Sequence, residues 1–199
     1  MSENQEHKTW IMYKKAPAKV IDYVGNPWGS NAWKIVEQYV SGNDSYCNME
    51  CVTPQGTWRA NVVASSFSKA KKDATILFDN NTSTKFYADS AGNAYATVTI
   101  IPPEKQYIKL SSIHIIGDYA NGACYVDVFT YDKDTEVKLS SSYHGKGSTT
   151  DKRLSYNRSL SYDKDIYSSK IQIRAYITNG GWGNLNINEI QITNCSIKY

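Results

Sequence analysis

Hydrophobic and polar residues alternate with a period of two along most of the chain beyond about residue 58. Asp127 lies between two valines, for example, and Gln172 lies between two isoleucines. Such alternation is typical of a β-strand with one face buried and the other exposed. The pattern predicts strands over residues 74–78, 94–101, 108–116, 124–131, 136–140, 166–176 and 185–192.

Turn-forming residues separate these hydrophobic segments. Asp, Asn, Gly and Pro favour the backbone conformations that tight turns require, so their clusters mark the ends of strands. Many short strands joined by loops indicate an all-β sandwich or barrel. The clusters lie at residues 79–81, 91–93, 102–103, 121–122, 145–147 and 179–181.

The first 57 residues have a different pattern. Short strands are expected at residues 9–13 and 21–24, and residues 31–40 fit either a helix capped by Asn31 or an irregular strand. Three of the five tryptophans, Trp10, Trp28 and Trp33, lie here, which argues against a flexible tail. We therefore expect residues 1–57 to be a small N-terminal appendage that docks on the main domain or on an assembly partner, and residues 58–199 to form the β-sandwich.

Composition narrows the range of partners and compartments. The net charge is +3 and the basic residues are scattered, which does not favour a nucleic-acid partner. Neither a secretion signal nor an apolar stretch long enough to cross a bilayer is visible, so we expect no membrane insertion, and either a cytoplasmic protein or one on a virion surface that lysis releases. The spacing of the four cysteines disfavours a zinc site and favours buried free thiols; they are Cys47, Cys51, Cys124 and Cys195.

Signatures of catalysis are missing from the sequence. It contains no nucleophile elbow, no zinc-protease motif and no phosphate-binding loop. Of the histidines, His114 lies within a predicted strand and is expected to be structural, whereas His144 lies in a predicted loop where it could contact a ligand. Because no acidic residue is marked by its context as a general acid, we expect a protein without enzymatic activity. A glycan-active enzyme is the weaker alternative.

Residues 62–86, VVASSFSKAKKDATILFDNNTSTKF, resemble the opening of discoidin-like domains, which are also called coagulation-factor type C or galactose-binding-like domains. Residues 107–117 and 170–192, the latter including INEIQI, resemble later strands of the same family. The resemblance spans about residues 60–195, although Phe86 stands where the family has Trp. It implies a jelly-roll β-sandwich with ligand-binding loops at one end, often specific for sugars.

The resemblance also implies a structural calcium ion. Asp79, Asn81 and Thr84 lie in the corresponding loop, and Glu189 occupies the place where members add a carboxylate from the last strand. These residues offer the oxygen ligands that calcium prefers. An Asx turn without an ion is the alternative. Many eukaryotic members have a disulfide that joins the two ends of the domain, for which Cys51 and Cys195 are the candidates.

Aromatic residues in predicted loops are candidates for sugar contacts. Sugars have apolar faces and many hydroxyl groups, so their sites combine an aromatic ring with a few polar groups. Trp182 stands out because three glycines surround it and leave its ring accessible; the alternative is a ring folded back on the sandwich edge. The other candidate ligand residues are Tyr87, Tyr119, Tyr143 and His144.

These observations together predict a non-catalytic carbohydrate-binding or adhesion module that recognises a glycan or another cell-surface ligand. The alternative is a structural virion protein, such as a phage capsid decoration or tail protein. Its sandwich would serve mainly assembly, with residues 1–57 docked on the particle. Fold alone does not decide between these functions, because function resides in the loops.

Overall fold

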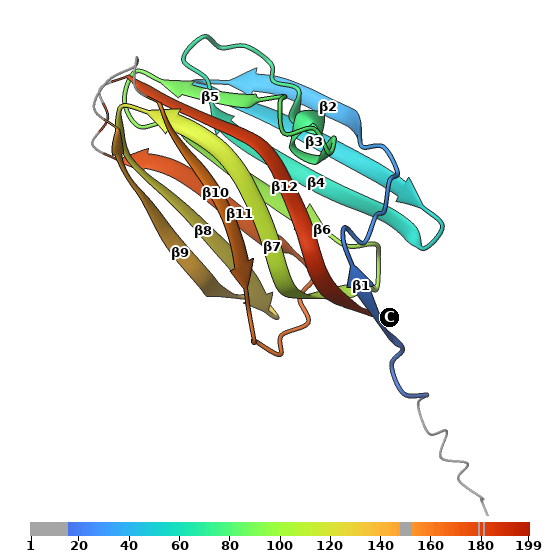
Figure 1. Ribbon diagram of the computed structural model, residues 1–199. Helices are drawn as coiled ribbons and strands as arrows, with labels where there is room; N and C mark the ends of the chain where they lie inside the picture. Colours follow the sequence, from blue (N-terminus) through green and yellow to red (C-terminus); the bar gives the residue numbers. More distant parts are fainter. Residues whose placement is uncertain (1–15, 148–152, 179, 181) are drawn as a thin grey trace, which may run out of the picture.

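The computed structural model describes residues 16–147, 153–178, 180 and 182–199, and they fold into two β-sheets packed face to face (Figure 1). The first sheet has the order β1-β12-β7-β10, with β5 also paired to β12, and the second has the order β2-β3-β4-β6-β11-β8-β9. The predicted all-β sandwich is therefore confirmed.

Twelve strands and one short 3-10 helix, η1, make up the described part of the chain. They are β1 (Val20–Val24), β2 (Lys34–Ser41), β3 (Asp44–Thr53), β4 (Gly56–Ser65), η1 (Ala74–Phe78), β5 (Phe86–Ser90), β6 (Tyr95–Ile101), β7 (Tyr107–Ala120), β8 (Gly122–Asp132), β9 (Thr135–Gly147), β10 (Leu154–Ser161), β11 (Ile171–Thr178) and β12 (Gly183–Lys198).

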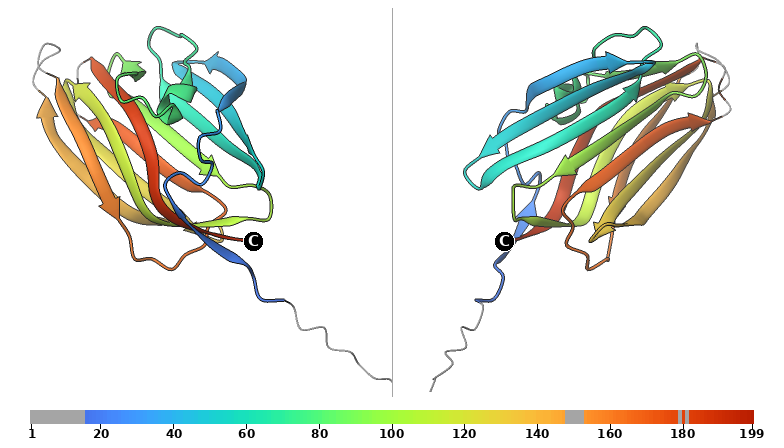
Figure 2. Two further views of the ribbon diagram at one scale, coloured as in Figure 1. Left: turned by 45° about the vertical axis from the view of Figure 1, so that its right-hand side comes forward. Right: turned by 180° about the vertical axis from the view of Figure 1, so that it is seen from behind.

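From β4 onward the chain passes repeatedly from one sheet to the other. Strands β4, β6, β8 and β11 belong to the seven-stranded sheet, and β5, β7, β10 and β12 belong to the five-stranded sheet. The two layers are visible from the side and from behind in Figure 2. Apart from the hairpin of β8 and β9 in the seven-stranded sheet, the crossings place consecutive strands on opposite layers, as in a jelly roll, and the loops that make them gather at the ends of the sandwich.

The core lies between the sheets and follows the period of two. In β6 and β11 every second residue is buried, and the residues between them face outward. Ala96, Val98 and Ile100 of β6 and Ile171 and Ile173 of β11 all lie in this core. Removing such apolar surface from water is the main stabilising contribution to the fold.

The expected boundary near Trp58 is wrong, because it separates paired strands. β1 pairs with β12 from Val20–Lys198 to Val24–Asn194. β3 pairs with β4, so that Cys51 lies opposite Trp58 across the predicted boundary. Residues 20–53 are therefore part of both sheets rather than an appendage. The strand expected at residues 9–13 lies outside the described residues.

Trp28 shows why the N-terminal residues belong to the core. Its side chain is only 2% exposed. Its ring makes edge contacts with Trp33, Trp58 and Phe78 at centroid distances of 5.2, 5.6 and 5.4 Å. Aromatic pairs in this geometry add to the energy of burial. The turn between β1 and β2 thus supplies a central part of the hydrophobic core.

Two local predictions also need correction. Residues 74–78 form the 3-10 helix η1 instead of a strand, because the side chain of Asp73 accepts a hydrogen bond from the backbone N of Thr75 at 2.9 Å and caps the turn. Residues 34–41, for which a helix was one option, form strand β2. The hydrophobic pattern also leaves β3, β4, β5 and β10 unpredicted.

All four cysteines are buried free thiols. Cys51 lies on β3 of the seven-stranded sheet, and Cys195 lies on β12 of the other sheet, so the disulfide implied by the family resemblance is not formed. Burial raises the pKa of Cys195 to about 12, which keeps this thiol protonated and unreactive. Within the described residues, no helix is long and apolar enough to cross a membrane.

Candidate functional site

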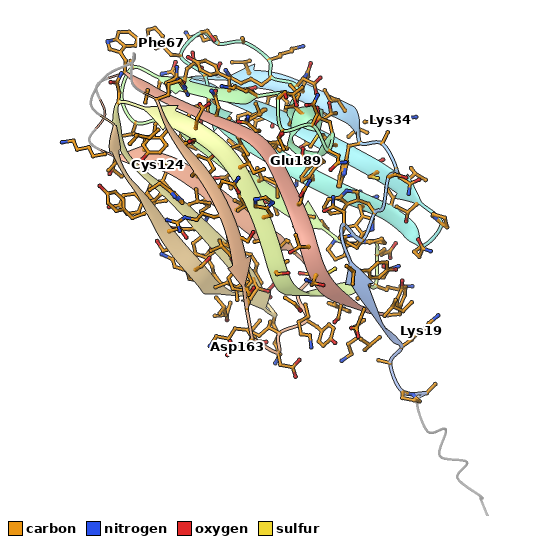
Figure 3. All side chains as sticks on the ribbon, in the orientation of Figure 1. Lys19, Lys34, Phe67, Cys124, Asp163 and Glu189 are labelled. Atoms are coloured by element: carbon orange, nitrogen blue, oxygen red, sulfur yellow. The ribbon has the colours of Figure 1, made fainter. Side chains whose placement is uncertain are left out.

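Trp182 and Tyr87, two of the predicted ligand residues, line the same small pocket at one end of the sandwich. We call it the loop-end pocket; Figure 3 labels Phe67 at this end. The cavity has a volume of about 280 Å³. Its lining residues are Phe67, Tyr87, Asp89, Ser90, Trp182, Gly183 and Asn184.

Three segments that are distant in sequence form the loop-end pocket. Phe67 lies in the turn after β4, where its backbone N donates a hydrogen bond to the Asp89 carbonyl oxygen at 3.2 Å. Tyr87 lies on β5, and Trp182 directly precedes β12. The pairing of β5 with β12, with Tyr87 opposite Asn186, brings Tyr87 and Trp182 together. A parallel bridge between Ser66 and Asp89 attaches the turn of Phe67 to β5 and so adds the third aromatic side chain. Phe67 was not predicted as a site residue.

Trp182 is held in place while its ring stays exposed. Its carbonyl oxygen accepts a hydrogen bond from Nδ2 of Asn121 at 3.0 Å. A Cβ at Gly183 would lie 2.4 Å from the carbonyl oxygen of Gly92, so only glycine permits this close backbone approach. The ring is 59% exposed and meets Phe67, 50% exposed, at right angles with a centroid distance of 5.0 Å. Gly183 therefore has two roles: it permits the close approach of the backbone to Gly92, and it has no side chain that could cover the Trp182 ring.

Polar groups stand beside this aromatic pair. Asn184 donates from Nδ2 to the Tyr87 hydroxyl at 2.9 Å, and its buried Oδ1 has no hydrogen-bond partner. Lys72 forms an ion pair with Asp89 at 3.0 Å and lies 5.1 Å from the centre of the Tyr87 ring. The lysine partly covers Tyr87, so Trp182 and Phe67 provide the open aromatic surface, and Asn184 lies beside it with a buried, unpartnered Oδ1.

Tyr119 was predicted in a loop, and this placement is wrong. Strand β7 extends as far as Ala120, beyond the predicted end at residue 116, and carries Tyr119 into the core with 0% exposure. Its hydroxyl donates a hydrogen bond to the Gly145 carbonyl oxygen at 3.0 Å. Burial raises the pKa of Tyr119 to about 12. The side chain therefore ties β7 to β9 and cannot reach a ligand at the surface.

Tyr143 and His144 lie on β9 and do not line the loop-end pocket. Tyr143 is 53% exposed, and its ring packs at a tilt against the Tyr125 ring with a centroid distance of 5.1 Å. The Tyr125 ring in turn stacks on Tyr176 at 5.4 Å. The three tyrosine rings lie side by side across the outer face of the seven-stranded sheet, on β9, β8 and β11. Tyr125 and Tyr176 cover each other. His144 is partly buried beside Tyr156; burial lowers its pKa, and the positive charge of Arg158 lowers it further.

The predicted metal residues of the first loop form a network of short-range hydrogen bonds. One oxygen of Asp79 accepts from the backbone N of Asn81 and the other from the hydroxyl of Thr84, each at 2.8 Å. The side chain of Asn81 accepts from the backbone N of Ser83 at 3.0 Å. These are the Asx-type contacts that the ion-free alternative predicted.

Glu189 lies buried beneath this loop. A β-bulge between Ile187 and Glu189 interrupts the pairing with β7, and Asn188 donates from Nδ2 to the Thr82 carbonyl oxygen at 2.7 Å. Glu189 is 1% exposed, and neither carboxylate oxygen makes a hydrogen bond of good geometry. Burial, and then the charge of Asp79, raise the pKa of Glu189 to about 8, although the backbone N–H groups of Asn80 and Asn81 lie near enough to lower this pKa somewhat. The structure thus brings Glu189 to the loop that the sequence predicted.

This oxygen-rich arrangement fits a hard cation. A buried carboxylate with two bare oxygens is costly unless a positive charge compensates it. The described residues contain no group of three or more His, Cys, Asp or Glu side chains suited to hold a metal ion. An ion between Asp79 and Glu189 would therefore also depend on amide or carbonyl oxygens, such as the buried, unpartnered Oδ1 of Asn188, as calcium sites commonly do.

Comparison of the sequence with family models and with curated proteins gives no match. Among solved structures, the chain is similar to TmCBM61 in complex with β-1,4-galactotriose, with 10% identity, a TM-score of 0.35 and coverage of 70% of this chain and 87% of that chain. It is similar to the CBM22-1 xylan-binding domain of Paenibacillus barcinonensis Xyn10C, with 12% identity, a TM-score of 0.37 and coverage of 85% and 97%. It is also similar to the enzymatically active domain of bacteriophage CBA120 tailspike protein 4, with 11% identity, a TM-score of 0.33 and coverage of 81% and 19%. These values assign the chain to no family.

Proposed function

We propose that this protein is a non-catalytic carbohydrate-binding module whose sugar contacts lie in the loop-end pocket. The observation that carries the proposal is the exposed pair of Trp182 and Phe67 beside the unpartnered Oδ1 of Asn184. An aromatic ring offers a surface for the apolar face of a sugar, and polar groups at the edge of the ring can bind its hydroxyl groups.

The dimensions of the pocket suggest the kind of contact. A volume of about 280 Å³ suits a terminal sugar ring better than a long chain laid across the surface. The position at the end of the sandwich leaves space for the rest of a glycan to extend into solvent. A module that recognises chain ends is suited to adhesion to glycans on a surface. We further propose that the protein has this adhesive role and that it is displayed on a virion or another assembly.

Replacing Trp182 by alanine tests the proposal. Because stacked aromatic anchors dominate binding energy, Trp182→Ala should weaken binding at least about tenfold, equivalent to about 1.4 kcal/mol. A glycan array would identify the ligand, and calorimetry with that glycan would give the two affinities.

Tyr107→Ala is the matched control, because Tyr107 is an exposed aromatic residue that does not line the pocket. It should bind like the wild type. Equal affinities of the Trp182→Ala variant and the wild type would exclude the loop-end pocket as the sugar site, provided that both melt at similar temperatures.

As a second element of the proposed function, we propose a structural calcium ion between the loop from Asp79 to Thr84 and Glu189. Support comes from the two bare oxygens of the buried Glu189 carboxylate and from its repulsion by Asp79. Such an ion would fix the loop next to η1. It would stabilise the fold and does not need to touch the sugar.

A further inference from the structure

A second and larger cavity lies at the open edge of β12, on the side opposite β7. On this side β12 pairs with β5 through Gly183–Ile187 and with β1 through Asn194–Lys198. On this side of β12, residues 188–193 have no neighbouring strand, although the other side pairs with β7. The missing strand leaves a notch in the sheet edge. The connection from β1 to β2 and the end of η1 surround this notch and enclose a volume of about 780 Å³, which we call the notch cavity.

Four side-chain amides line the notch cavity, and each uses only one end within the protein. Asn26 accepts from the backbone N of Ile192 at 2.7 Å, which leaves its Nδ2 free. Asn31 donates to the Trp28 carbonyl oxygen at 2.8 Å, which leaves its Oδ1 free. Gln191 donates to Oδ1 of Asn80 at 2.9 Å, so Nδ2 of Asn80 and Oε1 of Gln191 remain free.

The cavity thus presents two free donors and two free acceptors, all uncharged. The hydrogen bonds that each amide makes to the protein fix the orientation of its free end. A ligand that matches this set must itself combine donors and acceptors, which hydroxyl groups do.

Charge narrows the class of ligand further. Among the described residues that line the cavity, Asp79 is the one ionisable residue, and none is Lys, Arg or His. Both carboxylate oxygens of Asp79 already accept hydrogen bonds within its own loop. An anionic ligand therefore finds no positive charge here, and a cationic ligand would have to compete for an acceptor that is already engaged. A neutral ligand fits best.

Trp33 supplies an apolar wall with one unsatisfied polar atom. The ring is 7% exposed and stacks on Phe78 with a centroid distance of 4.8 Å, and both residues line the cavity. The buried indole Nε1 of Trp33 has no hydrogen-bond partner. Leaving such a donor unpaired is costly, and sites that recognise ligands commonly contain such atoms.

We propose that the notch cavity is a binding site for a neutral polyhydroxylated ligand, meaning a sugar or polyol of one or two rings, and that it is separate from the loop-end pocket. The volume lies within the range of ordinary small-molecule sites. The free amide ends bind hydroxyl groups, and the stacked aromatic pair forms the apolar wall. The site does not depend on the proposed function of the loop-end pocket, since the two cavities share no lining residue.

Indole N–H signals of the tryptophans, observed by nuclear magnetic resonance, distinguish the two sites. The probes are methyl β-galactopyranoside, methyl α-glucopyranoside and cellobiose as neutral ligands, with glucuronate and glucosamine as charged counterparts, all in one calcium-containing buffer. At least one neutral probe should shift the Trp33 signal in a saturable way. Glucuronate should bind at least tenfold more weakly.

Two variants locate the binding. Ala32→Tyr places a bulky side chain at the lining of the notch cavity and should abolish the Trp33 shift, while Gln191→Ala should weaken binding at least threefold. Val52→Tyr, at an exposed position of β3 outside the cavity lining, is the matched control and should bind as the wild type does. Gln191→Ala decides the question if Ala32→Tyr fails to fold.

Three results would overturn the proposal. The first is a Trp33 signal that no neutral probe shifts, even if Trp182 responds; that response would leave the loop-end pocket supported on its own. The second is an unchanged affinity in both folded cavity variants. The third is equal binding of glucuronate and the neutral probes, since it would contradict the argument from charge.

Discussion

Trp28 and Trp182 have similar sequence surroundings, but one side chain is buried and the other is exposed. Each stands in a glycine-containing turn, and each turn carries the chain from one sheet to the other. Yet Trp28 is 2% exposed and Trp182 is 59% exposed. The difference comes from what covers each crossing. The crossing from β1 to β2 runs beside η1, whose Phe78 contacts Trp28. Trp182 directly precedes β12, which begins at one end of the sandwich (Figure 1).

The comparison shows that the local sequence around a tryptophan does not determine its role. Glycines beside Trp182 led to the expectation of an accessible ring, and this ring is indeed exposed. The same reasoning, applied to the glycines near Trp28, would predict an exposed Trp28 side chain. What separates the two is the packing of η1 and β4 over the first turn, and these elements lie about 30 to 50 residues further along the chain.

Alanine substitution at the two tryptophans should give the largest difference. Trp28→Ala leaves a cavity among Trp33, Trp58 and Phe78, and we expect it to lower the free energy of unfolding by about 3–5 kcal/mol. Trp182→Ala loses mainly its contact with Phe67, so its cost should stay below about 1 kcal/mol. Urea denaturation of the two variants measures both values.

Equal stability losses in these two variants would contradict the comparison. The Trp58→Ala variant is a useful control, because Trp58 belongs to the same buried cluster but lies inside the segment that the sequence already assigned to the sandwich. It should resemble Trp28→Ala. A mild effect at Trp28 together with a severe effect at Trp58 would restore the idea of a separable N-terminal segment.

Much of the fold could be predicted from the period of two, because β6, β7, β8, β11 and β12 bury large aliphatic residues at alternate positions. Strand β3 was missed because its buried positions hold Ser45, Cys47, Met49 and Cys51, which give a weak alternation. In β10 only Tyr156 is buried, so no pattern is visible there. That residue reaches past Gly117 to donate to the Asn186 carbonyl oxygen, a contact between distant strands.

The candidate site was predictable to the extent that it depends on local chemistry. The loop from Asp79 to Thr84 forms the expected turn, and Glu189 reaches it through the β-bulge in β12. Tyr119 was misplaced because β7 runs further than its hydrophobic residues indicated. Phe67 was missed because it reaches Trp182 only through two long-range pairings, the bridge from Ser66 to Asp89 of β5 and the pairing of β5 with β12. The notch cavity follows from the gap between β1 and β5, which no sequence pattern reveals.

Calcium should stabilise the side of the molecule that holds Trp28. The proposed ion lies in the loop that follows Phe78, so ordering this loop supports the aromatic cluster. A ligand at about 100 times its Kd adds about 2.7 kcal/mol to the free energy of unfolding. Thermal melting after chelation and again after calcium addition should therefore show a rise in Tm of several degrees.

Glu189→Gln is the matched variant for this experiment. It keeps the shape of the side chain but cannot ionise, so the ion-free variant should be at least as stable as the ion-free wild type. It should also lose the response to calcium. A wild-type Tm that calcium leaves unchanged, or an equal response in Glu189→Gln, would argue against the ion and for the hydrogen-bonded turn alone.

The smallest expected effect is a change of stability with pH caused by His144, which lies near the end of the sandwich that holds Trp182. His144 is on β9, whose last residue, Gly147, pairs with Gly122; the neighbouring Asn121 holds the Trp182 carbonyl. Burial lowers the pKa of His144 from its ordinary value of 6.5 in the folded protein. Below about pH 6.5, His144 is protonated in the unfolded chain but still neutral in the folded protein. The free energy of unfolding therefore decreases as the pH falls from about 6.5 through the lower pKa of the folded state.

Comparison with His144→Gln isolates this contribution from that of the carboxylates, which titrate over a nearby range. The difference in unfolding free energy between wild type and variant should shrink by about 1 kcal/mol or less between pH 8 and pH 5, because the ring is only partly buried. Urea denaturation at several pH values measures it, with His114→Gln as the control for loss of a histidine on β7. A constant difference across this range would mean that His144 accepts its proton equally well in the folded and unfolded chains. The packing of β9 against Tyr156 would then exclude less water than the burial of its ring indicates.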